Sequence, residues 1–599
     1  MFDLPARDRR SLLHSAFRCG IATAGAASLA RPLSAHQVGD TTEPSNRSSA
    51  SNFARSSRGV AASVHPLASQ AAIDAMRSGG NAVDAAVAAS LMLSVVDGHN
   101  SGLGGGCFIM LRTPSGKCIA IDGRETAPGL ATPDRFTRDG QPDPMSTRVG
   151  PKAVGTPGQV AALDSLLKNH GRRSFAQAIA PAQRVAEEGF VLEAYGCKRM
   201  ASVAGLLKAD PGSRSVYFDS RGQILRPGDT LKQPDLAATL KQLATRGADW
   251  FYEGDFAKQV DAWMRANDGL LRQEDFRNYR VLNRQPILAR YRDHSIYLFP
   301  PPSSGGVHIA QALSILQSYD LTQLHDKTPD AFYHLLLETM RLVMADRVRH
   351  LGDADFVDVP RGLLDEDYLR GRASNLSLKQ VMEAVEPGQP KDTTPWPKSP
   401  AKMPDAAEKH TTHLTTADAD GNVVAITQTI NTTYGSKVIV PGTGVVLNNE
   451  MDDFSIGAGI ANAYGLMGGQ ANRIQPGKRP LSSMSPSIAI QDETGEIFSC
   501  GAAGGPRILT TVLQLLIRHI DLKQSPEMLL AAPRVHHQWR PATSFMEAGL
   551  SEETQQTLKE LGHPLKTLTY NSTAQALRCD AQQLQAASDP RVPGAARGL

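Results

Sequence analysis

One threonine in this sequence, Thr411, has surroundings that suit a nucleophile. It lies within Glu408–Thr416, between a proline-rich tract and an alternating, β-branched run. A hydroxyl alone is a poor nucleophile, but a threonine at a chain N-terminus carries a general base, its free α-amine, within reach of its own Oγ1. The reference pKa of an α-amine is about 7.7–8.0, so roughly 10–17% of it is unprotonated at pH 7 and can act as a base. Because Thr411 is internal, this chemistry requires cleavage of the bond between His410 and Thr411.

The residues after Thr411 predict a β-hairpin. Residues 411–417 and 422–429 alternate or are β-branched, and Asp418–Gly421 supplies a turn between them. Thr429 lies on the returning strand. The turn is not a calcium-binding loop, because such a loop needs glycine at its sixth position and glutamate at its twelfth, and this run has neither.

Two further elements are predicted closer to the N-terminus. Residues 107–112 and 117–122 form the strands of a second hairpin, which delivers Arg124 just past its end. Asn81 caps a helix over 82–96 that is apolar almost all round. Such a pattern is typical of a helix buried between layers.

The chain between the two hairpins carries no catalytic motif that we identify. Residues 160–380 are mostly helical in their periodicity. Residues 387–404 contain six prolines, which cannot continue a helix. We therefore predict an exposed linker over 387–410 that lets the new ends move apart after cleavage.

The composition excludes some classes of partner. The chain has 63 Lys and Arg against 60 Asp and Glu, a formal net charge of +3, and no basic block longer than a few residues, so nucleic acid is not implied. Six cysteines are scattered without C-x-x-C or other metal-ligand spacing, so no metal or other cofactor is expected. A chain of 599 residues can bury one large composite core, which must supply most of the stability.

Residues 1–35 resemble a twin-arginine secretory signal. Arg9–Arg10 precedes a modestly apolar run over 16–30, and a small-residue cleavage site follows near Ala35. The run is too short and interrupted to be a good membrane span. Export would place the mature protein in the periplasm, with 36–58 as a flexible leader. A disordered tail with a chance pair of arginines is the alternative.

Six blocks from residue 411 onward resemble, in the same order, the small-subunit pattern of the gamma-glutamyltransferases. The blocks are Thr411–His413, Asp418–Asn422, Asn431–Gly435, Leu447–Phe454, Arg479–Pro486 and Gly504–Gly505. The likeness continues in Asn100–Gly106, Asp122–Glu125, His536–Trp539 and Ala587–Arg591, and it spans about residues 59–592.

This resemblance implies a fold and a maturation step. The fold would be α/β (α+β), a four-layer αββα sandwich of the N-terminal-nucleophile hydrolase class. The precursor would cleave itself before Thr411 into a large subunit, 59–410, and a small catalytic subunit, 411–599. The subunits would stay associated as a heterodimer because the two central sheets draw strands from both.

The resemblance also implies the catalytic groups. In the family, the hydroxyl that matches Thr429 bonds to the nucleophilic threonine. The glycine pair that matches Gly504 and Gly505 forms the oxyanion hole with its N–H groups. Glycine suits this role because a side chain would block the close approach of the developing alkoxide.

A γ-glutamyl group presents an α-carboxylate and an α-ammonium, and the resemblance implies a partner for each. Arg124 would grip the carboxylate bidentately, a geometry that Lys would not match. The hydroxyl pair that completes this part of the pocket matches Ser482 and Ser483. The ammonium-binding set matches Asn431, Glu450 and Asp453.

The implied activity is acyl transfer. Thr411 would attack the γ-amide of glutathione or a relative, and the γ-glutamyl ester would pass to water, an amino acid or a peptide. A β-lactam side-chain (glutaryl) acylase or a poly-γ-glutamate-cleaving enzyme is the alternative, which the intact Arg124, Asp453 and Ser482–Ser483 disfavour. A third hypothesis is an unprocessed binding protein for γ-glutamyl compounds.

Two further features remain open from the sequence. Residues 456–469, which include Tyr464, correspond to a loop that closes over the site in some relatives, and a lid and a static loop both fit. His413, His536 and His537 lack metal-ligand spacing, so we predict that they pack or position other groups.

Overall fold

The computed structural model describes residues 51–398, 411–457, 459–569 and 572–599. The predicted signal over 1–35 and the cleavage-site residue His410 lie outside the described residues. The described part of the predicted linker, 387–398, contains no helix and is exposed at most positions.

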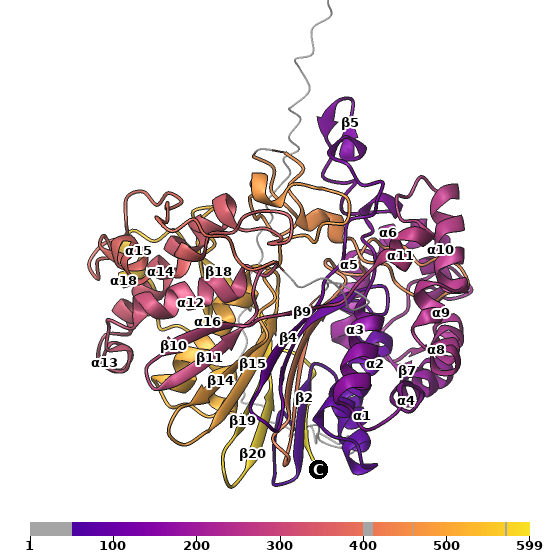
Figure 1. Cartoon of the computed structure of the whole chain (residues 1–599), viewed down its shortest axis with the longest axis horizontal. Coiled ribbons are helices and arrows are strands. Elements are labelled where there is room, and N and C mark those ends of the chain that lie inside the picture. The colour runs from indigo at the N-terminus through magenta and orange to yellow at the C-terminus, as the bar shows by residue number, and fades with distance from the viewer. Residues whose placement is uncertain (1–50, 399–410, 458, 570–571) are drawn as a thin grey trace, which may run out of the picture. The chain divides into compact units, whose positions relative to one another are not determined.

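Two seven-stranded sheets, each antiparallel throughout, form the centre of the described chain (Figure 1). The first runs in the order β1 (Phe53–Ser56), β20 (Leu584–Ser588), β19 (Thr573–Cys579), β15 (Ile497–Ala503), β14 (Ser487–Gln491), β11 (His294–Leu298), β10 (Ile287–Tyr291). The second runs in the order β21 (Ala595–Gly598), β2 (Gly59–Ser63), β12 (Thr412–Asp418), β13 (Val423–Thr429), β3 (Gly106–Arg112), β4 (Cys118–Gly123), β9 (Leu282–Arg284). Both sheets therefore combine strands from before and after Thr411, as predicted.

Helices cover the outer face of each sheet, which completes the predicted αββα order (Figure 1). The second sheet is covered by α1 (Pro66–Arg77), α2 (Ala82–Val96) and α3 (Gln159–His170), with α4 (Phe175–Glu188) and α8 (Pro234–Arg246) beyond them. The first sheet is covered by α12 (Gly305–Leu316), α16 (Arg507–Ile520) and α17 (Pro526–Ala531), with α14 (Pro329–His350) packed on α12.

The remaining elements are short and lie outside these layers. The helices are α5 (Ala194–Ser202), α6 (Ala204–Ala209), α7 (Pro211–Tyr217), α9 (Asp249–Tyr252), α10 (Asp255–Ala266), α11 (Gln273–Asn278), α13 (Leu321–Lys327), α15 (Glu366–Ala373) and α18 (Glu552–Glu560). The strands are β5 (Thr137–Arg138), β6 (Gln141–Pro142), β7 (Phe190–Val191), β8 (Thr230–Leu231), β16 (Val535–His536), β17 (Ser544–Glu547) and β18 (Leu565–Leu568).

The two sheets face each other across a largely apolar layer. Phe108 of β3 stacks on Phe299 with ring centroids 3.9 Å apart. His413 of β12 lies in the same layer, where a Cβ on Gly501 of β15 would come within 2.3 Å of its ring. Burial lowers the pKa of His413 to about 3, and its Nδ1 hydrogen-bonds with Thr427 at 2.9 Å. The prediction that His413 is a packing residue is confirmed.

The predicted leader, 36–58, is wrong at its C-terminal end. Residues 53–56 form β1, which pairs with β20 from Phe53↔Ala587 to Ser56↔Leu584. The sequence did not predict this strand because it lies at the edge of a sheet. Its side chains are at most partly buried there, so its sequence lacks the apolar pattern of a central strand. The helical section over 160–380 likewise contains β10 and β11, which pair with each other and extend the first sheet from β14.

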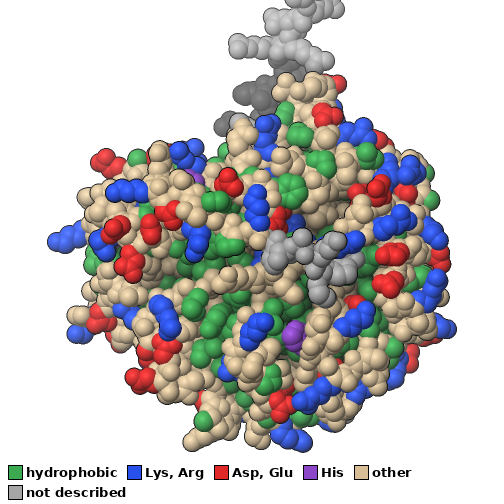
Figure 2. Space-filling model, viewed as in Figure 1, with side chains coloured by type: hydrophobic (Ala, Val, Ile, Leu, Met, Phe, Trp, Pro, Cys, Tyr) green, Lys and Arg blue, Asp and Glu red, His purple; other side chains and the backbone are tan. Residues whose placement is uncertain are grey.

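The next features of the described chain are its surface charge, its lack of a helix suited to span a membrane, and its free thiols. Acidic and basic side chains are interspersed over the face shown in Figure 2. No helix among the described residues combines the length and apolarity that crossing a membrane requires. The thiols that the structure describes as free are Cys107, Cys118, Cys197, Cys500 and Cys579.

The buried helix α2 matters for the site because it ends directly before the loop that leads to β3. Every residue of α2 is buried. Its N-terminus is fixed by a capping box in which Asn81 accepts from Asp84 N–H, and the Asp84 carboxylate accepts from Asn81 N–H at 2.7 Å. The same carboxylate also accepts from the backbone N–H groups of Arg172 and Arg173.

We predict that Asp84→Ala lowers the free energy of unfolding by about 3 kcal/mol or more, because it leaves three backbone donors without their acceptor at a buried position. The matched control is Asp74→Ala on α1, an exposed carboxylate paired with Arg77, which should change stability by less than about 1 kcal/mol. Denaturant unfolding of both variants measures the difference. Equal losses of stability in the two variants would contradict the role of the Asp84 carboxylate as the acceptor of these backbone N–H groups.

Candidate active site

Thr411 and Thr429 meet at the open end of the β12–β13 hairpin. The strands pair from Thr412↔Gln428 to Ala417↔Val423, so Thr411 directly precedes the first pair and Thr429 directly follows it. Thr411 Oγ1 donates to Thr429 Oγ1 at 3.4 Å, a long contact, while Thr429 itself is buried and accepts from the Asn431 N–H at 3.1 Å. The hairpin predicted from the sequence therefore brings both hydroxyls together.

Gly504 and Gly505 connect β15 of the other sheet to α16. Their φ angles are 136° and 62°, which other residues rarely adopt, and a Cβ on Gly505 would come within 2.6 Å of the Tyr464 ring. Both glycines lie beside Thr411 in the wall of one cavity. Because they directly precede the N-terminus of α16, a negative charge that develops here is also favoured by the helix dipole.

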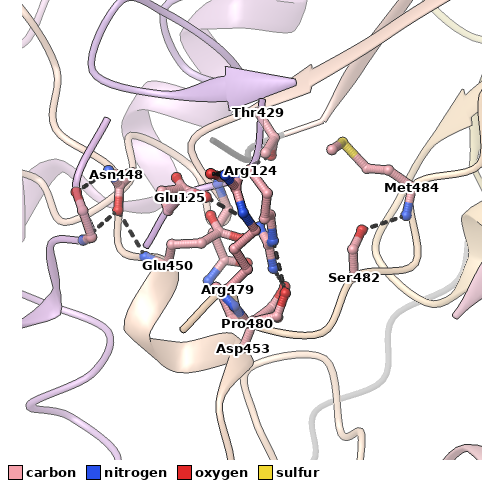
Figure 3. A network of polar contacts seen from close by, with 12 residues as sticks. Arg124, Glu125, Thr429, Asn448, Glu450, Asp453, Arg479, Pro480, Ser482 and Met484 are labelled. Carbon is pink, nitrogen blue, oxygen red and sulfur yellow. Dashed lines mark hydrogen bonds and ion pairs between the residues drawn. The ribbon is translucent and has the colours of Figure 1, made fainter. Parts of the chain in front are cut away.

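Arg124 lies just past β4 and is the centre of a buried ion-pair network (Figure 3). Its guanidinium is fully buried, pairs with Asp453 at 2.9 Å, and donates from Nε to the Pro480 carbonyl at 2.9 Å. It also pairs with Glu125 at 3.2 Å and with Glu450. Glu450 and Asp453 bound the short 3-10 helix η4 (Glu450–Asp453), which aims both carboxylates at the same guanidinium.

A second group of charges holds the backbone of Arg124 in place. Arg479 donates to the Arg124 carbonyl at 2.6 Å and to Asp122 at 3.1 Å, and Asp122 accepts from the Arg124 N–H at 2.9 Å. Burial alone would raise the pKa of Asp122, but the guanidinium groups of Arg479 and Arg284 lower it. The carboxylate is therefore ionised and fixes the turn that carries Arg124.

Four of the six predicted substrate-binding residues line one small cavity together with Thr411. Its lining includes Arg347, Thr411, Thr429, Asn431, Asp453, Tyr464, Ser482, Ser483 and Gly505. Arg124 contacts this lining through its ion pair with Asp453. The segment that carries Ser482 and Ser483 is held through its own backbone, since the Ser304 hydroxyl donates to the Ser482 carbonyl at 2.8 Å. The structure thus brings the predicted site residues together, although Gly504 lines only the adjoining cavity and Glu450 joins through its ion pair with Arg124. His410 is not described.

The cavity also contains a cation that sequence reasoning missed. Arg347 lies on α14, inside the helical section without a motif, and is nearly fully buried. Burial lowers its pKa to about 10, and the nearby Asp453 carboxylate opposes that shift. A charged residue on a face of α14 that is otherwise buried is a signal of a functional site. Only the fold, however, shows that this face reaches the cavity at Thr411.

The loop 456–469, described except for residue 458, covers the cavity. The Tyr464 hydroxyl donates to the carbonyl of Asn431, which lies just past β13 with a φ of 71°. Asn462 donates to the Asp453 carboxylate at 3.1 Å. Burial raises the pKa of Tyr464, so its hydroxyl stays a donor. These contacts close the loop here, and its function as a lid stays a prediction.

A buried carboxyl supports the residue that follows the nucleophile. Asp97, directly after α2, accepts from Thr412 Oγ1 at 2.7 Å and from Asn100 Nδ2 at 2.8 Å. Burial raises its pKa to about 7, although both hydrogen bonds act in the opposite direction.

His536 and His537 are buried too, and burial lowers the pKa of each to about 3. The prediction that they are packing residues is confirmed.

Comparison with known proteins identifies the family. The model of the family described as Gamma-glutamyltranspeptidase matches residues 68–599. The chain belongs to this family. The glutathione hydrolase proenzyme of Escherichia coli strain K12 is 37% identical over 540 residues, which cover 90% of this chain and 91% of that protein.

Solved structures of similar proteins support the same fold. A cephalosporin acylase from Bacillus halodurans superposes with a TM-score of 0.80 at 26% identity, covering 94% of this chain and 99% of that one. A chain of Helicobacter pylori gamma-glutamyltranspeptidase gives 0.53 at 34% identity, covering 54% of this chain and 94% of that one. The protein is therefore an enzyme of the gamma-glutamyltranspeptidase family with the predicted N-terminal-nucleophile hydrolase fold.

We predict that Asp97 makes stability depend on pH. Because its pKa is raised from 3.8 to about 7, the folded protein keeps a proton that the unfolded chain loses, so the contribution to stability is present below about pH 4 and is lost as the pH rises through 7. Asp97→Asn does not titrate, so its stability relative to wild type should rise between about pH 4 and 7 and then level off. Unfolding of both proteins over this range measures the trend, and a constant difference would contradict it.

Proposed function

We propose that this enzyme is a self-cleaving gamma-glutamyltransferase and glutathione hydrolase whose nucleophile is Thr411. The observation that carries the proposal is that Thr411 and the Gly504–Gly505 pair, which come from different sheets, meet beside a cavity that contains both Asp453 and Ser482–Ser483. A nucleophile, an oxyanion pocket and a charged binding pocket are the parts that acyl transfer from a γ-glutamyl amide requires.

Maturation begins with the Thr411 hydroxyl. It attacks the carbonyl of His410, the acyl group shifts from nitrogen to oxygen, and water hydrolyses the ester. The products are a large subunit ending at residue 410 and a small subunit of 189 residues, 411–599. The new α-amine of Thr411 then serves as the base for its own hydroxyl. The shared sheets hold the two subunits together.

The donor is recognised through its two opposite charges. Arg124 and Asp453 already form an ion pair at 2.9 Å. A γ-glutamyl group can insert between them, with its carboxylate on Arg124 and on the hydroxyls of Ser482 and Ser483, and its ammonium on Asp453. The substrate thereby replaces a pair that the folded protein has already desolvated, so binding costs less than burying new charges.

The reaction proceeds in two halves. Thr411 Oγ1 attacks the γ-carbonyl, the alkoxide is stabilised by the N–H groups of Gly504 and Gly505, and the Thr411 amine returns its proton to the leaving amine. Water, an amino acid or a peptide then takes the γ-glutamyl group from the ester. Such a scheme has ping-pong kinetics. The Thr429 hydroxyl orients Oγ1 at 3.4 Å, and Tyr464 keeps water away while its loop is closed.

An acylase is the second candidate, supported by the similarity in fold to a cephalosporin acylase. A glutaryl side chain lacks the α-ammonium of a glutamyl group, so an acylase has no use for a buried acid at its position. Here Asp453 lines the cavity, and Glu450 and Asn431 lie next to it. The Asp453 carboxylate therefore favours a γ-glutamyl donor.

The twin-arginine-like segment over 1–35 is the feature that supports export of this enzyme to the periplasm.

The proposal is tested by mixing the purified protein with glutathione and measuring the release of glutamate and cysteinylglycine. We predict that Thr411→Ala reduces turnover by about 10³-fold or more and leaves the chain uncleaved, while Thr411→Ser retains cleavage and measurable turnover, because serine keeps the hydroxyl and the amine. Normal turnover in Thr411→Ala would refute the nucleophile.

A second prediction concerns donor choice. Asp453→Asn should lower kcat/KM for γ-glutamyl donors by about 10²-fold, because the donor ammonium loses its anionic partner. The same change should affect glutaryl amides, which lack the ammonium, by less than about 3-fold. Asp367→Asn, which makes the same change at an exposed carboxylate that pairs with Arg370 on α15, is the control. Equal losses for both donor classes would contradict the role of Asp453.

A further inference from the structure

The cavity that holds the predicted glutamyl pocket contains a cation, Arg347, that takes no part in the reaction proposed so far. Arg347 lies near the C-terminal end of α14, is 4% exposed, and lines the cavity together with Asp453 and Ser482–Ser483. Arg124, by contrast, has no exposed surface and is not part of the lining that the described residues form. The arginine that the cavity presents to an entering donor is therefore Arg347.

The guanidinium of Arg347 has hydrogen-bond donors to spare. An arginine side chain carries five N–H groups. Within the described chain this guanidinium makes one hydrogen bond, from Nε to Ser304 Oγ at 3.4 Å, a long contact. Asp346, its neighbour in sequence, is directed elsewhere, since it accepts from the Tyr368 hydroxyl at 2.7 Å and from Arg372 at 3.1 Å. Because a buried charge with unused donors is costly, this arrangement indicates a binding site for an anion.

The charges around the cavity call for a second cation. Arg124 is surrounded by three carboxylates, those of Glu125, Glu450 and Asp453. A donor carboxylate that approached this excess of negative charge would be repelled. Arg347 is close enough that the charges of Asp453 and Arg124 both act on its pKa, which burial lowers to about 10. With that pKa the guanidinium is charged near neutral pH, so it offsets the repulsion.

Ser304 holds Arg347 beside the serine pair of the cavity. It lies directly before α12, and its Oγ accepts from Arg347 and donates to the Ser482 carbonyl at 2.8 Å. The Ser304 N–H donates to the same carbonyl at 2.7 Å. The adjacent Ser303 hydroxyl donates to the Met484 carbonyl at 2.7 Å. One turn therefore fixes both the guanidinium and the segment that carries the two serine hydroxyls.

We propose that Arg347 determines donor specificity: it binds the α-carboxylate of the glutamyl group together with the serine pair, as a second cation beside Arg124. This inference rests on the proposed function and adds a binding residue to it. The carboxylate is several bonds away from the γ-carbonyl at Thr411, so the contact is made in the bound substrate and in the transition state alike. Its loss should therefore raise KM more than it lowers kcat.

The test uses three anilide donors with the same leaving group: γ-glutamyl, glutaryl, which lacks the ammonium, and 4-aminobutyryl, which lacks the carboxylate. Arg347→Gln should lower kcat/KM by about 10-fold or more for the two donors that carry the carboxylate, the effect expected of one lost charge-assisted hydrogen bond. For the 4-aminobutyryl donor the loss should be less than about 3-fold. Arg347→Lys should restore part of the loss, because lysine keeps the charge without the planar fork. Arg349→Gln, an exposed cation on the same helix, should leave all three values unchanged.

The outcomes separate the two proposals. If the wild-type enzyme turns over neither γ-glutamyl anilide nor glutathione, the proposed function fails. If it turns them over, and Arg347→Gln loses activity equally on all three donors or on none, only the inference about Arg347 fails. A donor that is turned over too slowly to measure is compared through its inhibition constant against γ-glutamyl anilide.

Should Arg347→Gln not mature, a crystal structure of the wild-type enzyme with bound glutamate, the product of hydrolysis, decides. An oxygen of the glutamate α-carboxylate should lie within about 3.2 Å of a guanidinium nitrogen of Arg347. A bound glutamate whose α-carboxylate makes no contact with Arg347 would overturn the inference.

Discussion

The register of β12 on β13 is the constraint on which the site depends. Pairing of Thr412 with Gln428 leaves Thr411 and Thr429 together at the open end of the hairpin. The register is fixed because Leu414 and Ile426 pair on the face that packs under α2. A slip of one residue would turn each side chain to the other face of the sheet and separate the two hydroxyls.

The burial of charged side chains is the second constraint, and the structure meets it by pairing each buried charge with charges of opposite sign. Arg124 is fully buried among three carboxylates, and Asp122 is buried between two guanidinium groups. Burying a charge is costly unless partners and hydrogen bonds compensate it. The network therefore keeps a cation and an anion side by side in a buried pocket, which suits a zwitterionic donor, and it ties residues from before Thr411 to residues after it.

Local patterns in the sequence were enough to predict the parts of the site that lie on short-range elements. Alternation and turn residues predicted the hairpin of Thr411 and Thr429, and an all-apolar run predicted the buried α2. Resemblance to a family supplied the roles of Arg124 and the glycine pair. The contribution of Arg347 was not predictable, because it lies on a helix without a motif and reaches the cavity at Thr411 only through tertiary packing. Strand β1 was missed for the same reason, since its pairing with β20 spans most of the chain.

The central claim is that Thr411 becomes the N-terminus of a catalytic subunit. Mass spectrometry of the purified wild-type protein, with N-terminal sequencing of its smaller fragment, tests this most directly. The account predicts a 189-residue fragment that begins Thr-Thr-His-Leu and stays associated with the larger one. A single intact chain with full activity, or a fragment that begins elsewhere, would contradict it.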